Sequence, residues 1–151
     1  MFWLILFPGI LLLIVVVLSA FLSWKSRTRP SLGIVNGQLV PCPNSPNCVC
    51  SESHTTTPTH AIKPIPFSGS PVDAFERLKR VVTDSGGELY ESTPDYFRAE
   101  FTSRIFRYVD DVEARLDAEG KVIHVRSSSR VGRSDLGANR QRIEQLRQGF
   151  Q

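Results

Sequence analysis

The first 24 residues contain no charged side chain and form one continuous apolar stretch. A helix needs about 20 apolar residues to cross a bilayer, so residues 1–24 are long enough to do so. Trp3 and Trp24 lie near the two ends, where indole rings favour the lipid headgroups. A cleaved signal peptide would have a basic start and small residues before the cut; here the start has no Lys or Arg, and Leu18 stands where a small residue is preferred. The sequence therefore predicts a retained, single-pass transmembrane anchor.

Two signals disagree about which side of the membrane the rest of the chain faces. Lys25, Arg27 and Arg29 follow the apolar stretch at once, and positive charges beside a span are retained in the cytoplasm. The three cysteines are clustered within residues 42–50, a pattern that indicates a disulfide in an exported domain. We give the charges slightly more weight, which favours a cytoplasmic domain but leaves the side undecided.

Beyond Pro30 the composition becomes that of a soluble domain with enough residues for one hydrophobic core. Residues 25–59 are rich in Pro, Ser and Asn, so we expect an irregular lead that contains the cysteine cluster. Residues 60–151 are expected to form the globular domain. The net charge is only +3, which gives no reason to expect a nucleic-acid partner.

Hydrophobic periodicity predicts the order β-α-β-β-β-β-α for residues 60–151. The expected elements are an edge strand at 60–67, a helix at 70–84, strands at 88–92, 96–103, 109–116 and 122–128, and a closing helix at 135–148. This order fits an α+β fold in which both helices cover one face of an antiparallel sheet.

One hairpin can be placed in register from the sequence. Residues 117–120 suit a four-residue turn that pairs Leu116 with Lys121. Counting back puts Val112 and Ala114 on an apolar face that belongs to the core. The opposite face then carries two acid–base pairs, Glu113 with His124 and Asp111 with Arg126. We expect this second face to be turned away from the core, or to form the wall of a groove if the sheet curves, with its ion pairs contributing modestly to stability.

The densest polar segment, residues 126–140, lies between the last expected strand and the last helix. Ser134 or Asp135 can cap that helix, because either side chain accepts hydrogen bonds from its free N–H groups. The arginines around the helix start, Arg130, Arg133 and Arg140, would then suit a phosphate, a carboxylate or a lipid headgroup. Alternatively, Asp135 occupies that position itself, and the arginines pair with the carboxylates of residues 110–113 as a structural network. The sequence gives the two interpretations equal weight.

Four segments resemble the motifs of a known family: LGIVNGQLVPCPNSPNCV (32–49), HAIKP (60–64), DDVE (110–113) and VRSSSRVGRSDLGANRQRIE (125–144). The family that they resemble is domain of unknown function 1499, found in bacteria and in plastid-bearing eukaryotes, often behind an N-terminal hydrophobic segment. The resemblance implies no reaction, substrate or cofactor, and it fits a protein of the bacterial plasma membrane. Cys50 departs from the family pattern, where a serine is usual.

The cysteines favour a structural role over catalysis. A disulfide between Cys42 and Cys48 would close a loop that contains two prolines, and it would stabilise the domain in an oxidising compartment. Metal ligation by the cysteines with His54 or His60 is the weaker alternative, because the C-x5-C-x-C spacing lacks the usual paired C-x2-C. The sequence contains no nucleophile elbow, P-loop or dinucleotide motif. We therefore expect no catalytic residue, no metal and no cofactor.

Three classes of function are consistent with these features. We first expect a non-catalytic binding module for a small anionic ligand, a lipid or a protein. The second class is a single-span accessory subunit of a larger membrane protein complex, and the third is an enzyme. The candidate binding residues are His60, Asp111, Glu113, Arg126, Arg130, Ser134, Asp135, Asn139 and Arg140. The expected partners are the lipid bilayer, a membrane protein complex and a small anionic ligand.

Overall fold

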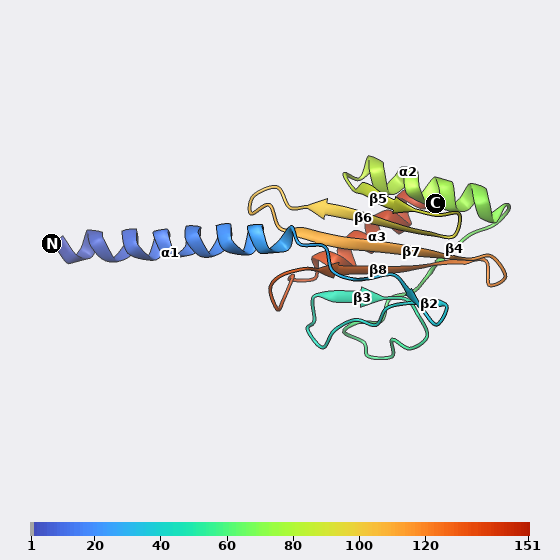
Figure 1. The fold of residues 1–151 in the computed structure, drawn as a ribbon, viewed down its shortest axis with the longest axis horizontal. Helices are drawn as coiled ribbons and strands as arrows, with labels where there is room; N and C mark the ends of the chain where they lie inside the picture. The colour runs from blue at the N-terminus through green and yellow to red at the C-terminus, as the bar shows by residue number, and fades with distance from the viewer. Residues whose placement is uncertain (1) are drawn as a thin grey trace.

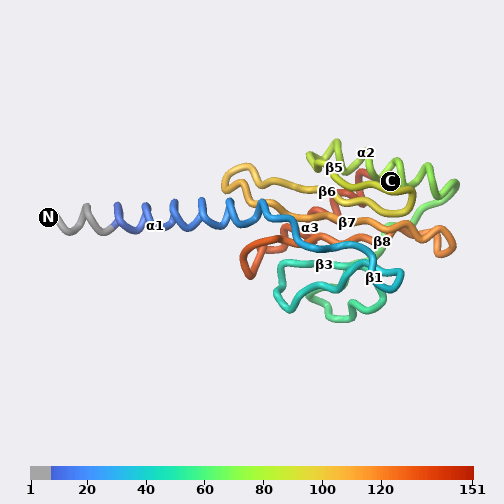
Figure 2. Tube along the Cα trace, viewed as in Figure 1, coloured from blue at the N-terminus to red at the C-terminus, as the bar shows by residue number. Residues whose placement is uncertain are grey.

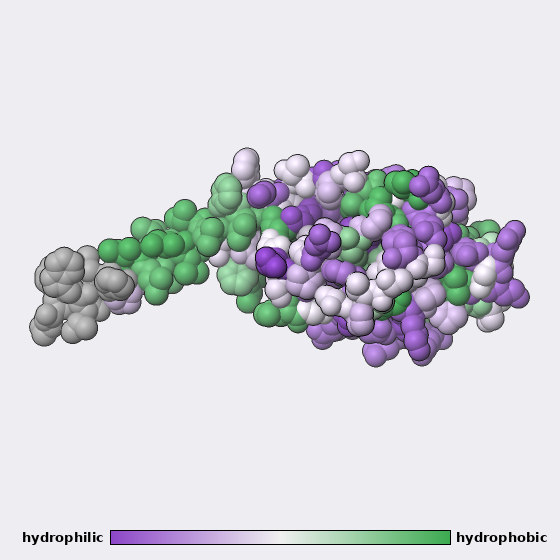
Figure 3. All heavy atoms as spheres, turned by 90° about the horizontal axis from the view of Figure 1, so that it is seen from below, coloured by the Kyte–Doolittle hydropathy of each residue, from purple (hydrophilic) through white to green (hydrophobic). Residues whose placement is uncertain are grey.

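The computed structural model describes residues 2–151, with the side chains from Pro8 onward. Its first element is the helix α1 (Phe2–Ser26), which projects from the rest of the molecule as one rod (Figures 1 and 2). By length and composition, the part from Pro8 to Ser26 is apolar enough to cross a membrane, and its side chains from Ile10 to Leu18 are exposed (Figure 3). The helix ends two residues beyond the expected limit at Trp24. Ser26 is fully buried, so the last turn of α1 is part of the domain.

A six-stranded antiparallel sheet forms the centre of the domain. Five strands follow the order β3-β8-β7-β6-β5, and β4 pairs with a further stretch of β8. The strands are β3 (Cys48–Cys50), β4 (Ile65–Pro66), β5 (Glu88–Ser92), β6 (Tyr96–Thr102), β7 (Val109–Asp117) and β8 (Val122–Ser129). The four long strands agree with the predicted bounds to within one residue, and the α+β class is confirmed.

The first predicted strand is much shorter than expected. Of residues 60–67, only Ile65 and Pro66 form a strand, β4. Pro64 and Pro66 have no backbone N–H to donate to a neighbouring strand, so the segment cannot form a longer ladder. It lies at the edge of the sheet, as predicted.

Two helices cover one face of the sheet, as predicted (Figure 1). The helix α2 (Pro71–Asp84) begins after Ser70, whose Oγ accepts a hydrogen bond from the Asp73 N–H. The helix α3 (Ala138–Phe150) ends the chain. The main core lies between the helices and the sheet, and its large members are Phe75, Leu78, Val82, Phe97, Val112, Ile123, Val125, Ile143, Leu146 and Phe150. Each such side chain contributes about 1.5–3 kcal/mol by leaving water.

The last helix begins three residues later than expected, at Ala138. Leu136 and Gly137 both adopt left-handed backbone angles, with φ of 53° and 85°, so the chain cannot be helical there. Asp135 still caps the helix from outside it, because its Oδ2 accepts a hydrogen bond of 2.7 Å from the Asn139 N–H. Its other oxygen accepts one of 3.1 Å from the Gly137 N–H.

The predicted hairpin has the right faces and the wrong register. The turn occupies residues 118–121, so Asp117 pairs with Val122 and Glu113 pairs with Arg126. Asp117 Oδ1 accepts a hydrogen bond from the Gly120 N–H, and the following Lys121 has a left-handed φ of 50°. These two features end the turn one residue later than expected. Because each cross-strand partner moves by two positions, the same side chains still share a face.

The second face of the sheet is buried as well, contrary to our prediction that it is turned outward. Glu113 is fully buried, and Asp111 and Arg126 are only 1% and 3% exposed. The cover is the segment after α1, which runs along the sheet and returns through β3 (Figure 2). It includes the small hairpin of β1 (Ile34–Val35) and β2 (Gln38–Leu39), and β2 lies against β7 and β8. The segment that we expected to be irregular therefore contributes three short strands and encloses a layer of charged side chains.

Candidate functional site

Arg130 connects the end of α1 to the sheet. Its Nε and Nη2 atoms donate hydrogen bonds of 2.7 and 2.6 Å to the two carboxylate oxygens of Asp111. Nη2 also donates to Glu100 Oε1 at 2.7 Å, and Nη1 donates to the carbonyl oxygen of Ser26 at 3.1 Å. The planar guanidinium group, with its several donors, suits this arrangement better than a lysine would. We call Arg130, Asp111, Glu100 and Ser26 the Arg130 clamp.

The contacts of the Arg130 clamp favour the charged forms of Arg130 and Glu100. Burial alone would lower the pKa of Arg130, but its hydrogen bonds with Asp111 and Glu100 raise it above the ordinary value. Burial would likewise raise the pKa of Glu100, and the hydrogen bonds from Arg29 and Arg130 outweigh this effect, so that pKa is lowered. Arg29 also lies 4.2 Å above the centre of the Tyr90 ring. At least one of the three basic residues after the apolar stretch is therefore used within the fold.

Two serines fix the last turn of α1 to the loop between β6 and β7 and to the first residue of β7. Ser23 Oγ donates a hydrogen bond of 3.2 Å to the carbonyl oxygen of Arg107. Ser26 Oγ accepts one of 3.1 Å from the Val109 N–H. The last carbonyl groups of a helix have no partner within it and carry partial negative charge, so Arg130 satisfies one of them and complements the helix dipole.

A second ion pair lies deeper under the cover. Arg126 Nη1 donates a hydrogen bond of 2.9 Å to Glu113 Oε2, and the Tyr96 hydroxyl donates one of 2.7 Å to Glu113 Oε1. Burial raises the pKa of Glu113, and the charge of Arg126 only partly offsets this effect. Burial and the charge of Glu113 raise the pKa of Tyr96 as well, so its hydroxyl keeps its proton.

A third buried carboxylate joins the cover to the sheet. Glu52 accepts hydrogen bonds from Arg115 Nε at 2.9 Å and Nη2 at 3.1 Å, and one from the Leu39 N–H at 3.1 Å. His124 Nδ1 is 3.4 Å from Glu52 Oε2, which also accepts the hydrogen bond from Arg115 Nη2. Burial alone would raise the pKa of Glu52, but the hydrogen bonds from Arg115 and Leu39 outweigh it and hold the pKa below its ordinary value of 4.5.

Replacing Glu52 by Gln should make the stability of the protein less dependent on acid pH. Because the pKa of Glu52 is lower in the folded state, its charge stabilises the fold above pH 4.5 and this contribution is lost as the pH falls further. We expect Glu52→Gln to cost about 1–3 kcal/mol at pH 7, and the cost to shrink below pH 4.5. Urea unfolding of wild type and Glu52→Gln in detergent, at a series of pH values, measures the difference in their free energies of unfolding. Glu144→Gln, at an exposed ion pair with Arg147, is the control and should cost less than about 1 kcal/mol at every pH. A cost for Glu52→Gln that does not change with pH would contradict the prediction.

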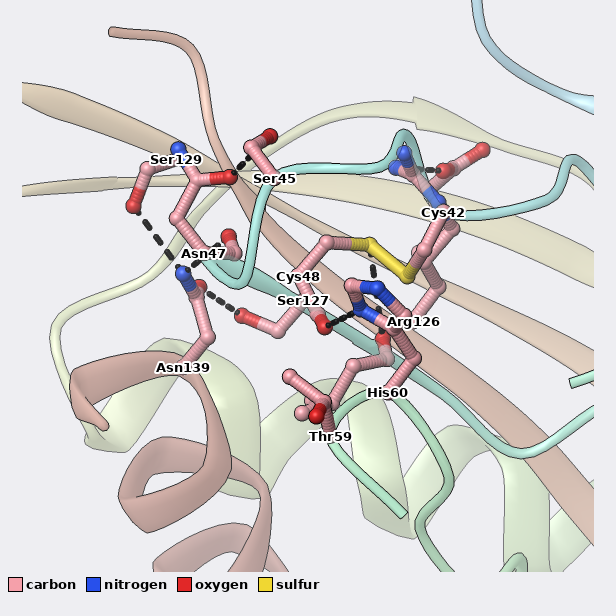
Figure 4. The surroundings of a disulfide bond; sticks show 12 residues. Cys42, Ser45, Asn47, Cys48, Thr59, His60, Arg126, Ser127, Ser129 and Asn139 are labelled. Atoms are coloured by element: carbon pink, nitrogen blue, oxygen red, sulfur yellow. Dashed lines mark hydrogen bonds and ion pairs between the residues drawn. A yellow bond between two sulfur atoms is a disulfide. The ribbon is translucent and has the colours of Figure 1, made fainter. Parts of the chain in front are cut away.

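Asn139 connects the cysteine loop to the last helix (Figure 4). Its Nδ2 group donates to the Asn47 carbonyl oxygen and to Ser129 Oγ, both at 2.9 Å. It also donates to Asp135 Oδ2 at 2.8 Å, while Asn139 Oδ1 accepts from Ser127 Oγ at 2.6 Å. The side chain is 1% exposed, so its polar atoms are used inside the protein. The two longest motifs that carry the family resemblance are therefore in direct contact.

The structure joins Cys42 and Cys48 by a disulfide, with 5.7 Å between the Cα atoms. His60 lies beside it and its Nδ1 is 2.9 Å from the Cys48 carbonyl oxygen (Figure 4). Cys50 is a buried free thiol, whose pKa burial raises. A buried neutral thiol is a poor nucleophile and a poor metal ligand.

A pocket of about 200 Å³ opens where α1 meets the domain. Leu22 of α1 forms one wall, and the loops 103–108 and 130–137 with the adjoining strand and helix ends form the others. The lining residues are Leu22, Ser103, Tyr108, Asp110, Ser129, Val131, Gly132, Ser134, Asp135 and Ala138. We call this the helix-exit pocket. Its charged lining groups are carboxylates and not arginines, so it is unsuited to an anion.

Catalytic groups are sparse in the part of the chain that the structure describes. No three His, Cys, Asp or Glu side chains within it lie close enough together to hold a metal ion. Ser51 Oγ is 3.3 Å from His124 Nδ1, within reach of a nucleophile and its base. However, Ser51 Oγ also accepts a hydrogen bond from the Val125 N–H, and neither residue lines the helix-exit pocket. Ser51 and His124 therefore belong to the contact between the cover and β8, and not to an open site.

The predicted site residues belong to several contacts and not to one open site. The pairs in direct contact are Asp111 with Arg130, Glu113 with Arg126, and Asn139 with Asp135. Arg140 donates to the carbonyl oxygens of Pro58 and Thr59 on the other side of the cysteine loop, next to His60. Ser134 and Asp135 line the helix-exit pocket. Of the three arginines that we expected to meet an anion, Arg130 is paired with carboxylates, as in the second of the two interpretations of this segment. Arg140 instead donates to backbone carbonyl oxygens, and Arg133 is exposed.

Sequence reasoning missed the partners that complete these contacts. Glu52 and Glu100 face inward from the cover and from β6, Ser26 ends α1, and Asn47 follows the second proline of the cysteine loop. Asn47 itself is indicated by the resemblance, because it lies within the CPNSPNCV motif, but its contact with Asn139 is not. For the other three, no local pattern indicates a distant partner.

The fold and these contacts define a class: an α+β domain with an antiparallel sheet, two helices on one face, a disulfide-closed cover on the other, and an N-terminal apolar helix fixed to the sheet. The sequence profile of the family described as "Protein of unknown function (DUF1499)" matches residues 38–150. The chain belongs to this family, as its motifs predicted. The comparison with curated proteins gives no match.

Proposed function

We propose that the protein is a single-span membrane protein whose domain is a non-catalytic module that binds an uncharged lipid in the helix-exit pocket. One observation carries this proposal: the pocket has the apolar helix as one wall and the domain as the others. If α1 is retained, the mouth of the helix-exit pocket lies where the helix leaves the bilayer. A lipid could then enter the pocket without crossing water.

The lining of the pocket indicates the chemistry of the lipid. Leu22, Val131 and Ala138 provide apolar contacts, while Ser103 and Ser134 carry hydroxyl groups. The carboxylate of Asp110 is already paired with Arg142, and that of Asp135 accepts backbone N–H groups. Carboxylates accept hydrogen bonds and repel anions, and hydroxyl groups both donate and accept, so the lining favours an uncharged lipid whose polar part bears hydroxyl groups. A volume of about 200 Å³ holds such a polar part and not a whole lipid.

The test is purification of the full chain in a mild detergent, followed by mass spectrometry of the extracted lipids. We expect an uncharged lipid at a fixed ratio to protein. Val131→Trp should fill the pocket and lower this ratio about tenfold. Ser85→Trp is the matched control, because Ser85 lines a different pocket of the same volume, beside Phe101, and its lipid content should not change. Equal lipid in both variants, or none in the wild type, would overturn the proposal. A protein recovered at a fixed ratio in place of lipid would overturn it too, in favour of an accessory subunit.

Retention of α1 can be decided independently by the intact mass of the purified chain. The start of α1 lacks the basic residues of a signal peptide, which supports retention. Cleavage of a signal peptide after Ala20 would leave Ser23 and Ser26 in the mature chain, where they could still form their hydrogen bonds with the domain. A folded domain therefore does not show whether α1 is retained. A mass that corresponds to loss of the first twenty residues would contradict an anchored protein.

The disulfide supports a domain on the oxidising side of the membrane, against the flanking charges. Two of those charges, Lys25 and Arg27, are exposed, whereas Arg29 is engaged with Glu100.

In chains taken directly from cells, we expect Cys42 and Cys48 to resist a maleimide reagent until a reductant is added. Replacing both by serine should cost about 2–3 kcal/mol of stability, because the open loop gains freedom in the unfolded chain. Cys50→Ser is the control for loss of the buried thiol. Labelling of all three cysteines in the denatured chain without reductant, instead of Cys50 alone, would place the domain in a reducing compartment.

A further inference from the structure

We infer that the loops 103–108 and 130–137 insert their tips into the headgroup region of a bilayer that contains anionic lipids. The two loops extend from opposite sides of α1, at the end of the domain where the helix leaves it (Figure 1). The inference depends on the proposed function only through the retention of α1, and not on the lipid in the helix-exit pocket.

The tips of both loops expose large apolar side chains. Ile105 is 84% exposed, Phe106 is 49% exposed and Leu136 is 98% exposed. None of the three belongs to either hydrophobic cluster of the domain. In Figure 3, green apolar atoms continue from the helix onto the adjacent end of the domain. A lipid surface is the partner that such a patch fits, because it is continuous with a helix of the same character.

The backbone presents these side chains outward. Leu136 has a φ of 53°, an unusual angle for a leucine, and Arg107 in the other loop has one of 57°. Phe106 stacks on Tyr108 with 5.4 Å between the ring centres. An aromatic pair of this kind, with a phenol beside an apolar ring, is typical of the bilayer interface.

Basic residues surround the apolar tips. Five exposed cations lie on the two loops and on the adjoining end of α1: Lys25, Arg27, Arg104, Arg107 and Arg133. Among residues 8–151, none of these five forms an ion pair. The loop 103–108 has no acidic residue, and the only one in 130–137, Asp135, is engaged at the start of α3. Positive charge around apolar tips is complementary to a surface of anionic headgroups.

The experiment uses the full chain in bilayer nanodiscs of phosphatidylcholine, with or without phosphatidylglycerol. A fluorescent amino acid is placed at position 105 or 136, and lipids with a spin label in the upper acyl chain serve as quenchers. We expect strong quenching at both positions. The same probe at Val72 is the control, because Val72 is 63% exposed and lies at the start of α2, at the opposite end of the domain.

Charge reversal tests the headgroup part of the inference. Each arginine near an anionic surface should change the ratio of inserted to released loops about fivefold. Arg104→Glu with Arg133→Glu should therefore reduce quenching in the discs that contain phosphatidylglycerol, and much less in phosphatidylcholine alone. Quenching at 105 and 136 that is no greater than at 72 would overturn the inference, even if a lipid occupies the helix-exit pocket. Strong quenching with an empty pocket would support it and overturn the proposed function alone.

Discussion

Replacing Arg130 by Ala is expected to destabilise the domain by about 3–5 kcal/mol, because it leaves buried charges without their partner. Asp111, which is 1% exposed, would lose both of its hydrogen bonds to the guanidinium group, and the Ser26 carbonyl oxygen would lose its donor. This loss is a large part of the 5–15 kcal/mol by which domains are stable. Denaturant unfolding in detergent, followed by circular dichroism, measures the effect.

Two variants show whether the geometry of Arg130 or merely a positive charge is needed. Arg130→Lys keeps the charge but cannot form the paired hydrogen bonds with Asp111, so we expect an intermediate loss. Arg133→Ala removes an exposed arginine from the same loop and should change stability by less than about 0.5 kcal/mol. Hydrogen exchange should also quicken around Ser26 in Arg130→Ala, since the end of α1 is released. Equal stabilities for Arg130→Ala and Arg133→Ala would contradict the assignment of the clamp.

The second large effect is expected at Glu113. Glu113→Leu leaves the guanidinium group of Arg126, which is 3% exposed, without its carboxylate, and removes the acceptor of the Tyr96 hydroxyl. We expect a loss of about 3–5 kcal/mol. The double variant Glu113→Leu with Arg126→Met should recover most of it, because an apolar pair of similar size needs no charged partner. A double variant no more stable than Glu113→Leu alone would show that packing, and not the unpaired charge, causes the loss.

The pH dependence of the Glu113→Leu effect has the opposite sign to that of Glu52. The pKa of Glu113 is raised in the folded state, so its contribution to stability is complete below its ordinary value of 4.5 and declines as the pH rises through the folded value. The difference between wild type and Glu113→Leu should therefore grow as the pH is lowered from 7 toward 4.5. Unfolding at both pH values provides the check.

Local pattern was enough to predict most elements of the fold. The four long strands alternate apolar and polar residues, and α2 begins with Ser70 and Pro71, so that their bounds follow from propensity and spacing. The hairpin between β7 and β8 was misplaced by one residue, because its register depends on the backbone angle at Lys121 and not on residue type.

The burial of the second face could not be predicted in the same way. Alternation shows which side chains share a face, but not whether another segment covers that face. The strands of the cover are two or three residues long, too short to show any period. The charged residues Asp111, Glu113 and Arg126 therefore looked like surface residues, although they lie in the interior.

The candidate site could be predicted only in part. The family motifs identified Arg130 and Asn139, yet the partner that gives Arg130 its position, Ser26, is 104 residues away in the chain. Asp111 and Arg130 were considered as a structural pair, and that pair is what the structure contains. The helix-exit pocket combines the end of α1 with two loops, an arrangement that depends on the whole topology of the sheet.

The way in which α1 ends gives the molecule a particular mechanical property. A domain on a flexible linker wanders over a wide region above the membrane and turns freely. In this protein the last turn of the helix is bonded to the sheet through Ser23, Ser26 and Arg130, without a joint that could swivel. In a bilayer, any tilt of the helix, such as one imposed by a thinner membrane, would rotate the whole domain by the same angle. The orientation of the outer surface of the domain would then depend on the thickness of the bilayer.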